Sequence, residues 1–198
     1  MFEKNGFIHH IDFYVLEVVC KLIQKRIKNN ERCFPISVNQ SRYLLKDKNY
    51  AIKVAQILNE YETPPQLIEL ELTERLFADK LPEMAKIMKK VKEIGILWSI
   101  DDFGTGYSSL NLLKELPVDI IKIDKTFLDE AEDSEASRII IRKTVELTRE
   151  LHKKVICEGV ETREQEKYLR EIQCDMAQGY LYAKPMPISE FENLVKEY

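Results

Sequence analysis

The chain has 198 residues, 44% of them hydrophobic and 32% charged, which is enough to form one domain with a sizeable core. Its net charge of −4 argues against binding of DNA or RNA through a broad basic surface. The four cysteines lack Cys-x-x-Cys spacing, and no apolar run approaches the ~18 residues that a membrane-spanning helix needs. We therefore expect a cytoplasmic protein with no membrane segment, zinc cluster or disulfide framework.

Strands and helices are predicted to alternate along the first half of the chain. Apolar residues at helical spacing indicate an amphipathic helix over 11–27, which Asp12 is expected to cap. A strand over 34–39, a helix over 50–61 and a strand over 67–72 follow in that order.

The middle of the chain continues the pattern. Pro82 is expected to open a helix that Gly95 closes. Trp98 and Ile100 then alternate with a serine, as in a buried strand, and lead into two aspartates.

The second half continues the alternation in the same way. Its expected elements are, in chain order, a helix over 110–116 capped by Ser108 or Ser109, a strand over 119–124, a helix over 134–151, a strand over 154–158, a helix opened by a capping box at Thr162, a strand over 176–181 and a terminal helix capped by Ser189. Strands that alternate with helices are typical of an α/β protein with a parallel sheet.

A polar residue stands at the carboxyl end of each predicted strand. These residues are Asn39, Glu71, Asp101, Lys122, Glu158 and Gln178. In a parallel barrel or open sheet all such ends gather on one face, where the active site lies. A solvated rim explains any one of these residues, but it explains the whole set much less well.

Asp101 and Asp102 form the centre of this pattern. Two adjacent carboxylates repel each other unless a cation or water compensates them. Gly104 and Gly106 then give the following loop the backbone freedom for a sharp turn. The alternative is a solvated acidic turn that merely precedes a helix.

The rim as a whole offers oxygen ligands for hard cations. Carboxylate and amide oxygens suit Mg²⁺, Mn²⁺ or Ca²⁺, and the candidate ligands are Asn39, Glu71, Asp101, Asp102 and Glu158. A pair of metal ions ~3.5–4 Å apart is the usual arrangement for cleavage of a phosphodiester. Lys122 could orient the nucleophile or neutralise charge on the phosphate, or it could simply form a salt bridge with one of the acids.

With these residues assembled, the chain resembles the EAL family of cyclic di-GMP phosphodiesterases over essentially its whole length. The resemblance is carried by six motifs in order. They are Val38–Ser41 (Val-Asn-Gln-Ser), Glu71–Glu74 (Glu-Leu-Thr-Glu), Asp101–Leu110 (Asp-Asp-Phe-Gly-Thr-Gly-Tyr-Ser-Ser-Leu), Ile121–Asp124 (Ile-Lys-Ile-Asp), Glu158–Glu161 (Glu-Gly-Val-Glu) and Gln178–Tyr180 (Gln-Gly-Tyr).

The resemblance implies a modified TIM barrel that hydrolyses cyclic di-GMP to linear pGpG in bacterial second-messenger signalling. It also implies dependence on Mg²⁺ or Mn²⁺, inhibition by Ca²⁺, and a catalytic set of Lys122, Glu158 and Gln178. The implied metal ligands are Asn39, Glu71 and Asp101 for one ion and Asp101, Asp102 and Glu158 for the other. Lys122 and Gln178 would lie near the attacking water.

The family resemblance assigns further residues to a loop that couples the site to a dimer interface. Glu74 is expected to steady this loop, which comprises Phe103, Gly104, Thr105, Gly106, Tyr107, Ser108 and Ser109. The expected partners are cyclic di-GMP, a second copy of the chain, and upstream sensory or cyclase domains of a longer protein.

The Glu-Ala-Leu motif that names the family does not occur in this sequence. Residues 1–198 are therefore expected to form a single EAL-type domain that lacks its first strands, with about six of eight strands and two unpaired edges. The glutamate of that motif would be missing from the first metal site. The alternative function is an inactive module that binds cyclic di-GMP or a partner protein.

Overall fold

The computed structural model describes residues 8–41, 47–77, 81–104 and 110–196. At its centre lies a six-stranded sheet whose strand order follows the chain, with every neighbouring pair parallel. The strands are β1 (Ile36–Asn39), β2 (Ile68–Thr73), β3 (Leu97–Phe103), β4 (Ile120–Ile123), β5 (Lys154–Cys157) and β6 (Met176–Ala177).

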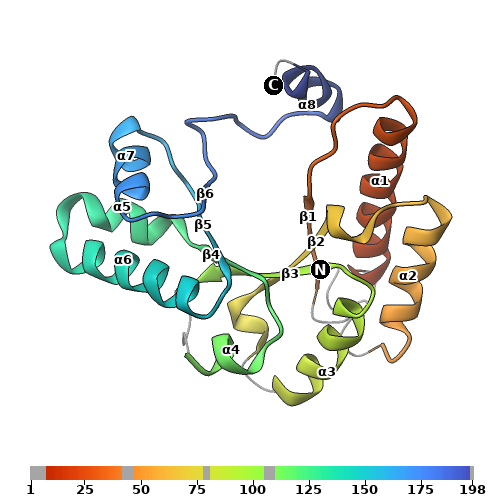
Figure 1. Ribbon diagram of the computed structural model, residues 1–198, viewed down its shortest axis with the longest axis horizontal. Helices are drawn as coiled ribbons and strands as arrows, with labels where there is room; N and C mark the ends of the chain where they lie inside the picture. Colours follow the sequence, from red (N-terminus) through yellow and green to blue (C-terminus); the bar gives the residue numbers. More distant parts are fainter. Residues whose placement is uncertain (1–7, 42–46, 78–80, 105–109, 197–198) are drawn as a thin grey trace.

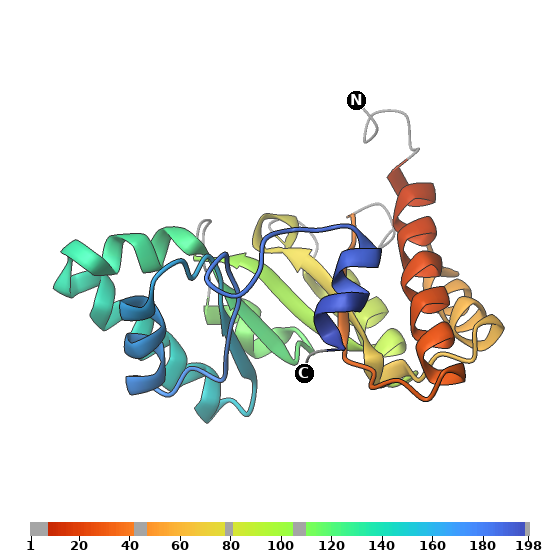
Figure 2. The same ribbon diagram turned by 90° about the horizontal axis from the view of Figure 1, so that it is seen from above.

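Helices line the outer side of the curved sheet, as Figures 1 and 2 show. They are α1 (Ile8–Lys28), α2 (Tyr50–Glu60), α3 (Leu81–Lys92), α4 (Leu110–Glu115), α5 (Lys125–Asp133), α6 (Glu135–Glu150), α7 (Arg163–Glu171) and α8 (Ile188–Val195). In Figure 1 the strands curve around the centre, and the curve is open on the side of α8. The predicted α/β architecture of an incomplete TIM-type barrel is thus confirmed.

The inner strands β2 and β4 are buried on both faces, but by different kinds of residue. In β2, Ile68, Leu70 and Leu72 are almost fully buried in the hydrophobic core. Glu69 and Glu71 alternate with them and are also buried. Because successive side chains of a strand point to opposite faces, the glutamates face the concave interior of the sheet. This alternation places acidic groups where water is scarce.

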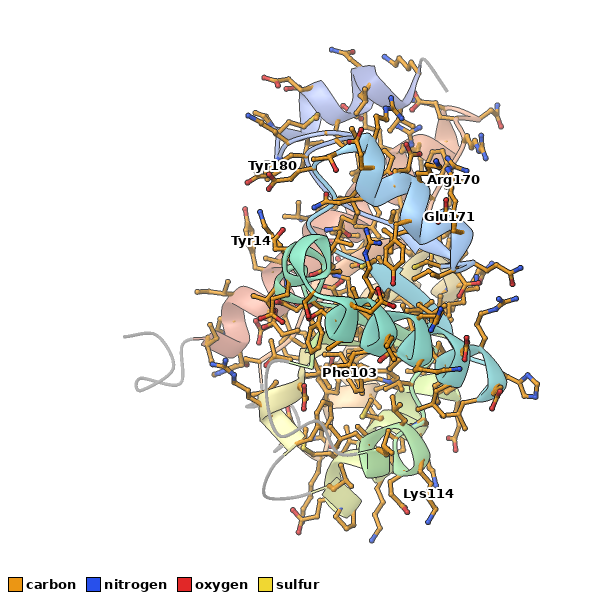
Figure 3. The ribbon with its side chains drawn as sticks, turned by 90° about the vertical axis from the view of Figure 1, so that its left-hand side faces the viewer. Tyr14, Phe103, Lys114, Arg170, Glu171 and Tyr180 are labelled. Atoms are coloured by element: carbon orange, nitrogen blue, oxygen red, sulfur yellow. The ribbon has the colours of Figure 1, made fainter. Side chains whose placement is uncertain are left out.

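The apolar side chains form two clusters. The larger cluster lies under α1 to α4 and includes Trp98, Phe103 and Ile121. The smaller one lies under α5 to α7 and includes Ile123, with Phe127 packed against it. The clusters therefore adjoin at β4. Figure 3, which faces α5 to α7, shows the buried Phe103 in the interior and the exposed Arg170 at the periphery.

Several features differ from the sequence prediction. The last strand, expected over 176–181, ends at Ala177. The helix α5 was not expected; it begins directly after β4, where Asp124 caps it by accepting from the Thr126 amide at 2.8 Å. Asp12 is not a cap, because α1 already includes Ile8; instead its carboxylate accepts from the Ser41 amide at 3.0 Å. Ser189 is also not a cap, since α8 begins one residue earlier.

The two edge strands, β1 and β6, face a gap that α8 borders. Helix α8 is tied to α1 by an ion pair of 2.7 Å between Lys25 and Glu192. A cleft of about 510 Å³, lined mainly by apolar side chains of α1, β1 and the segment from Gln178 to Leu194, lies beside this contact. Within the described parts of the chain, no helix is both long enough and apolar enough to cross a membrane.

Candidate functional site

Lys122 lies at the centre of a cluster of carboxylates. Its ammonium nitrogen is 2.6 Å from Glu158 Oε1, 2.7 Å from Glu71 Oε1 and 3.7 Å from Asp101 Oδ1. The side chains of Lys122 and Glu71 are each only 5% exposed, and those of Asp101 and Glu158 are 17% and 19% exposed. The salt-bridge alternative for Lys122 is therefore what the structure shows, with more than one acid as partner.

Adjacent strands bring these four residues together. Glu71 comes from β2, Asp101 from β3 and Lys122 from β4, while Glu158 directly follows β5. The Glu158 amide extends the β4–β5 ladder by donating to the Ile123 carbonyl at 3.0 Å. Parallel pairing thus aligns the carboxyl ends of four consecutive strands, as predicted for a shared rim.

The cluster holds more negative than positive charge. Glu71, Asp101 and Glu158 face the single ammonium of Lys122. Burial raises the pKa of Glu158 above its usual value although Lys122 opposes this effect. Burial alone would lower the pKa of Lys122, but the neighbouring carboxylates outweigh it and hold that pKa above the usual range. Lys122 therefore stays protonated at neutral pH.

The backbone makes a sharp turn at Asp101 and Asp102. The β3–β4 register shifts between Ile100 and Phe103, and Asp102 has a φ of 54°, which is unusual for a residue other than glycine. The Asp102 amide donates to Asp101 Oδ1 at 3.0 Å. Burial and the nearby Asp101 and Asp124 raise the pKa of Asp102. The turn thus holds two acids close together in a strained conformation.

Glu74 contacts the loop that follows this turn. It lies in a short 3₁₀ helix after β2 and is 3% exposed, and its Oε2 accepts from the Gly104 amide at 2.8 Å. Phe103, the first residue of the predicted loop, is buried. The other loop residues, Thr105 to Ser109, lie outside the described residues.

Asn39 and Gln178 lie at the two edges of the sheet rather than in the cluster. Asn39 ends β1, pairs in register with Glu71 and is exposed. Gln178 follows β6, is exposed, and borders the apolar cleft. Both stand at the same end of the sheet as the cluster, but neither forms an ion pair or hydrogen bond with Lys122 among the contacts described.

Two acidic residues near the cluster were not among the predicted site residues. Glu69 lies two residues before Glu71 on the same face of β2 and is 5% exposed. Burial raises the pKa of Glu69, and the nearby Lys122 lowers it. Asp124, the cap of α5, raises the pKa of Asp102. Glu69 could have been predicted from the sequence, because residues two apart on a strand point to the same face as each other. Asp124 could have been predicted from its position directly after β4.

The donor set fits a hard divalent cation in its chemistry. Carboxylate oxygens are the preferred ligands of Mg²⁺ and Mn²⁺, and the excess negative charge around Lys122 would be balanced by such an ion. Within the described residues no three acidic, histidine or cysteine side chains are already spaced as a metal site. In the structure the ammonium of Lys122 is the cation among these carboxylates.

Comparison with known proteins identifies the family. The family model described as EAL domain matches residues 1–185. The chain is 36% identical over 196 residues to the signaling protein YkoW of Bacillus subtilis, covering 98% of this chain and 24% of YkoW. It is 33% identical over 197 residues to the cyclic di-GMP phosphodiesterase NbdA of Pseudomonas aeruginosa, covering 99% of this chain and 25% of NbdA. The chain thus spans about a quarter of the length of these relatives.

A solved structure agrees with the sequence comparisons. The phosphodiesterase PaMucR in complex with c-di-GMP is 33% identical and superposes with a TM-score of 0.89, covering 96% of this chain and 77% of its own; the protein MucR is from Pseudomonas aeruginosa. From its sequence, its fold and its ordered acidic motifs, the chain belongs to the EAL domain family.

Proposed function

We propose that this chain carries out metal-dependent hydrolysis of cyclic di-GMP to linear pGpG. The observation that supports the proposal is the convergence of Glu71, Asp101 and Glu158 on the buried Lys122. The substrate is suggested by relatives named cyclic di-GMP phosphodiesterases and by a structural neighbour described as a c-di-GMP complex. Cytoplasmic localisation, a homodimer, and further sensory or cyclase domains remain part of the same proposal.

Two Mg²⁺ or Mn²⁺ ions are the proposed cofactors. The residues that would hold them are Asn39, Glu71, Asp101, Asp102 and Glu158. When bound, such ions polarise the phosphodiester and lower the pKa of the attacking water. The acidic character of the cluster supports this assignment, because a single lysine leaves its carboxylates with uncompensated charge.

The remaining site residues would act on charge and orientation. Lys122 stays protonated, so it would stabilise the charge that develops on the phosphate and would not serve as the general base. Gln178 is exposed at the edge of the sheet, where its amide could orient substrate or water. Glu74 would keep the loop after Asp102 in place through the Gly104 amide.

The test is hydrolysis of cyclic di-GMP by the chain 1–198 with Mn²⁺, followed by chromatographic detection of pGpG. We expect Asp101→Asn to lower the rate by about 100-fold or more and to weaken Mn²⁺ binding in calorimetry. Asp129→Asn, which changes an exposed aspartate on α5, is the matched control and should leave both unchanged. Full activity of Asp101→Asn would contradict the proposed site.

A second candidate function is binding of cyclic di-GMP without turnover. It is favoured by the edges of the sheet, where β1 and β6 face a gap and Asn39 and Gln178 are exposed. An open sheet could hold the ligand and yet leave the reacting groups incompletely placed. Binding of cyclic di-GMP by the unaltered chain, together with no pGpG in the same assay, would support this candidate against the first.

A further inference from the structure

The turn that carries Asp101 and Asp102 is strained, so other parts of the fold must hold it. Asp102 has a φ of 54° and Gly104 a φ of 103°, both in the left-handed region. Such conformations persist at functional sites only when surrounding contacts fix them. The described structure shows two contacts at Gly104 that can do so, one polar and one apolar.

The polar contact is the hydrogen bond from the Gly104 amide to Glu74, at 2.8 Å. The apolar contact comes from the ring of Phe127. A Cβ atom added at Gly104 would lie 2.5 Å from Phe127 Cζ and still closer to Cε2, so the ring lies directly against the glycine backbone. Only a residue without a side chain allows this approach.

Phe127 is itself held in place by the second core cluster. It lies on α5, three residues after the capping residue Asp124, and packs against the cluster that includes Ile123 and Leu128. Phe103, the neighbour of Gly104, belongs to the first cluster. The Phe127 ring therefore contacts the turn from the side of the second cluster, while Phe103 of β3 fixes the turn in the first cluster. Because the two clusters are closely packed, a small displacement of the ring shifts the turn.

The same turn of α5 also contacts the loop next to Glu158. A Cβ atom added at Gly159 would lie 2.5 Å from Cβ and Cγ of Lys125, and Gly159 has a φ of 70°. Lys125 also forms an ion pair with Glu161. The first turn of α5 thus packs against two glycines, Gly104 and Gly159, that closely follow the predicted metal ligands Asp102 and Glu158.

We propose that Phe127 is a positioning residue: its ring, packed on Gly104, sets the place of the Asp101–Asp102 turn and thereby the geometry of the carboxylate cluster. The chemical consequence rests on the proposed function, whereas the structural part concerns only the turn. Phe127 would act through the backbone and does not need to touch the substrate. Removal of an outer-shell group that hydrogen-bonds to a metal ligand typically weakens metal affinity about 10- to 100-fold, and we expect a loss toward the lower end of this range for Phe127, which acts through packing.

The first experiment measures hydrogen exchange of the Gly104 amide by NMR without metal. In Phe127→Ala we expect this amide to exchange at least about tenfold faster, because the turn is no longer held against α5. The matched control is Phe34→Ala, which removes another half-buried ring just before β1, at the opposite end of the sheet. Unchanged exchange at Gly104 in Phe127→Ala, or an equal increase in Phe34→Ala, would overturn the inference.

The second experiment is a double-mutant cycle on Mn²⁺ affinity measured by calorimetry. Gly104→Ala should weaken binding about tenfold or more, because the added methyl group must displace the Phe127 ring. In the Phe127→Ala background, Gly104→Ala should reduce Mn²⁺ affinity clearly less, because there is no ring for the methyl group to displace. The backbone strain that alanine introduces at position 104 is the same in both backgrounds, so it cancels in the cycle. Additive losses would overturn the inference. If the unaltered chain binds no Mn²⁺, the proposed function fails, and exchange at Gly104 still decides the inference.

Discussion

The middle of the sheet and its two edges hold their site residues in different ways. On β2 and β4, the side chains of Glu71 and Lys122 are buried and are joined by an ion pair of 2.7 Å. On β1 and after β6, Asn39 and Gln178 are exposed. In the middle, burial fixes the geometry before any ligand arrives, whereas at the edges the side chains are free for a ligand to order. Changes to the site side chains in the middle should therefore affect folding, and changes to the exposed site side chains at the edges should affect mainly binding.

The largest expected effect is that of Lys122→Met. The change removes the ammonium that pairs with Glu71, Asp101 and Glu158 and leaves these carboxylates facing each other. We expect the free energy of unfolding in urea to fall by about 3–5 kcal/mol, the usual result of removing one partner from a buried ion pair. Lys143→Met, which breaks an exposed pair with Glu146, is the control and should change stability little. A loss below about 1 kcal/mol for Lys122→Met would show that the ion pairs of Lys122 do not stabilise the middle of the sheet.

An intermediate effect is expected for Gly179→Ala, beside the edge strand β6. A Cβ atom there would lie 2.8 Å from the carbonyl carbon of Val160 and closer to the amide nitrogen and oxygen of that residue. Because backbone cannot move aside as a flexible side chain can, we expect the free energy of unfolding to fall by about 1–3 kcal/mol. Urea denaturation followed by circular dichroism measures this. Stability equal to that of the unaltered chain would mean that the loop after β6 shifts freely.

The smallest stability effects are expected for Asn39→Ala and Gln178→Ala. Both residues are exposed, so the free energy of unfolding should stay within about 0.5 kcal/mol of the original. Asn39→Ala should nevertheless weaken Mn²⁺ binding about tenfold or more in calorimetry, since the proposed site loses an oxygen ligand. Asn59→Ala, at an exposed position near the end of α2, is the control and should alter neither quantity. Unchanged Mn²⁺ affinity in Asn39→Ala would remove this residue from the proposed site.

Much of the fold followed from local sequence patterns. The spacing of apolar residues predicted the alternation of strands and helices, and the polar residues at strand ends predicted a common rim, which the parallel sheet provides. The helix α5 was missed because it begins directly after β4, with no loop between them to mark its start. Asp12 and Ser189 were misjudged because helix boundaries depend on contacts beyond the nearest residues.

The sequence by itself determined the α/β class, the order of the acidic motifs and the family to which the chain belongs. Only the tertiary structure decided that Lys122 pairs with Glu71 and Glu158, and that the ring of Phe127 rests on Gly104. The physical reason is that motifs and periodicity are properties of neighbouring residues. Ion pairs and close packing depend on how strands and helices far apart in the chain meet in the folded molecule.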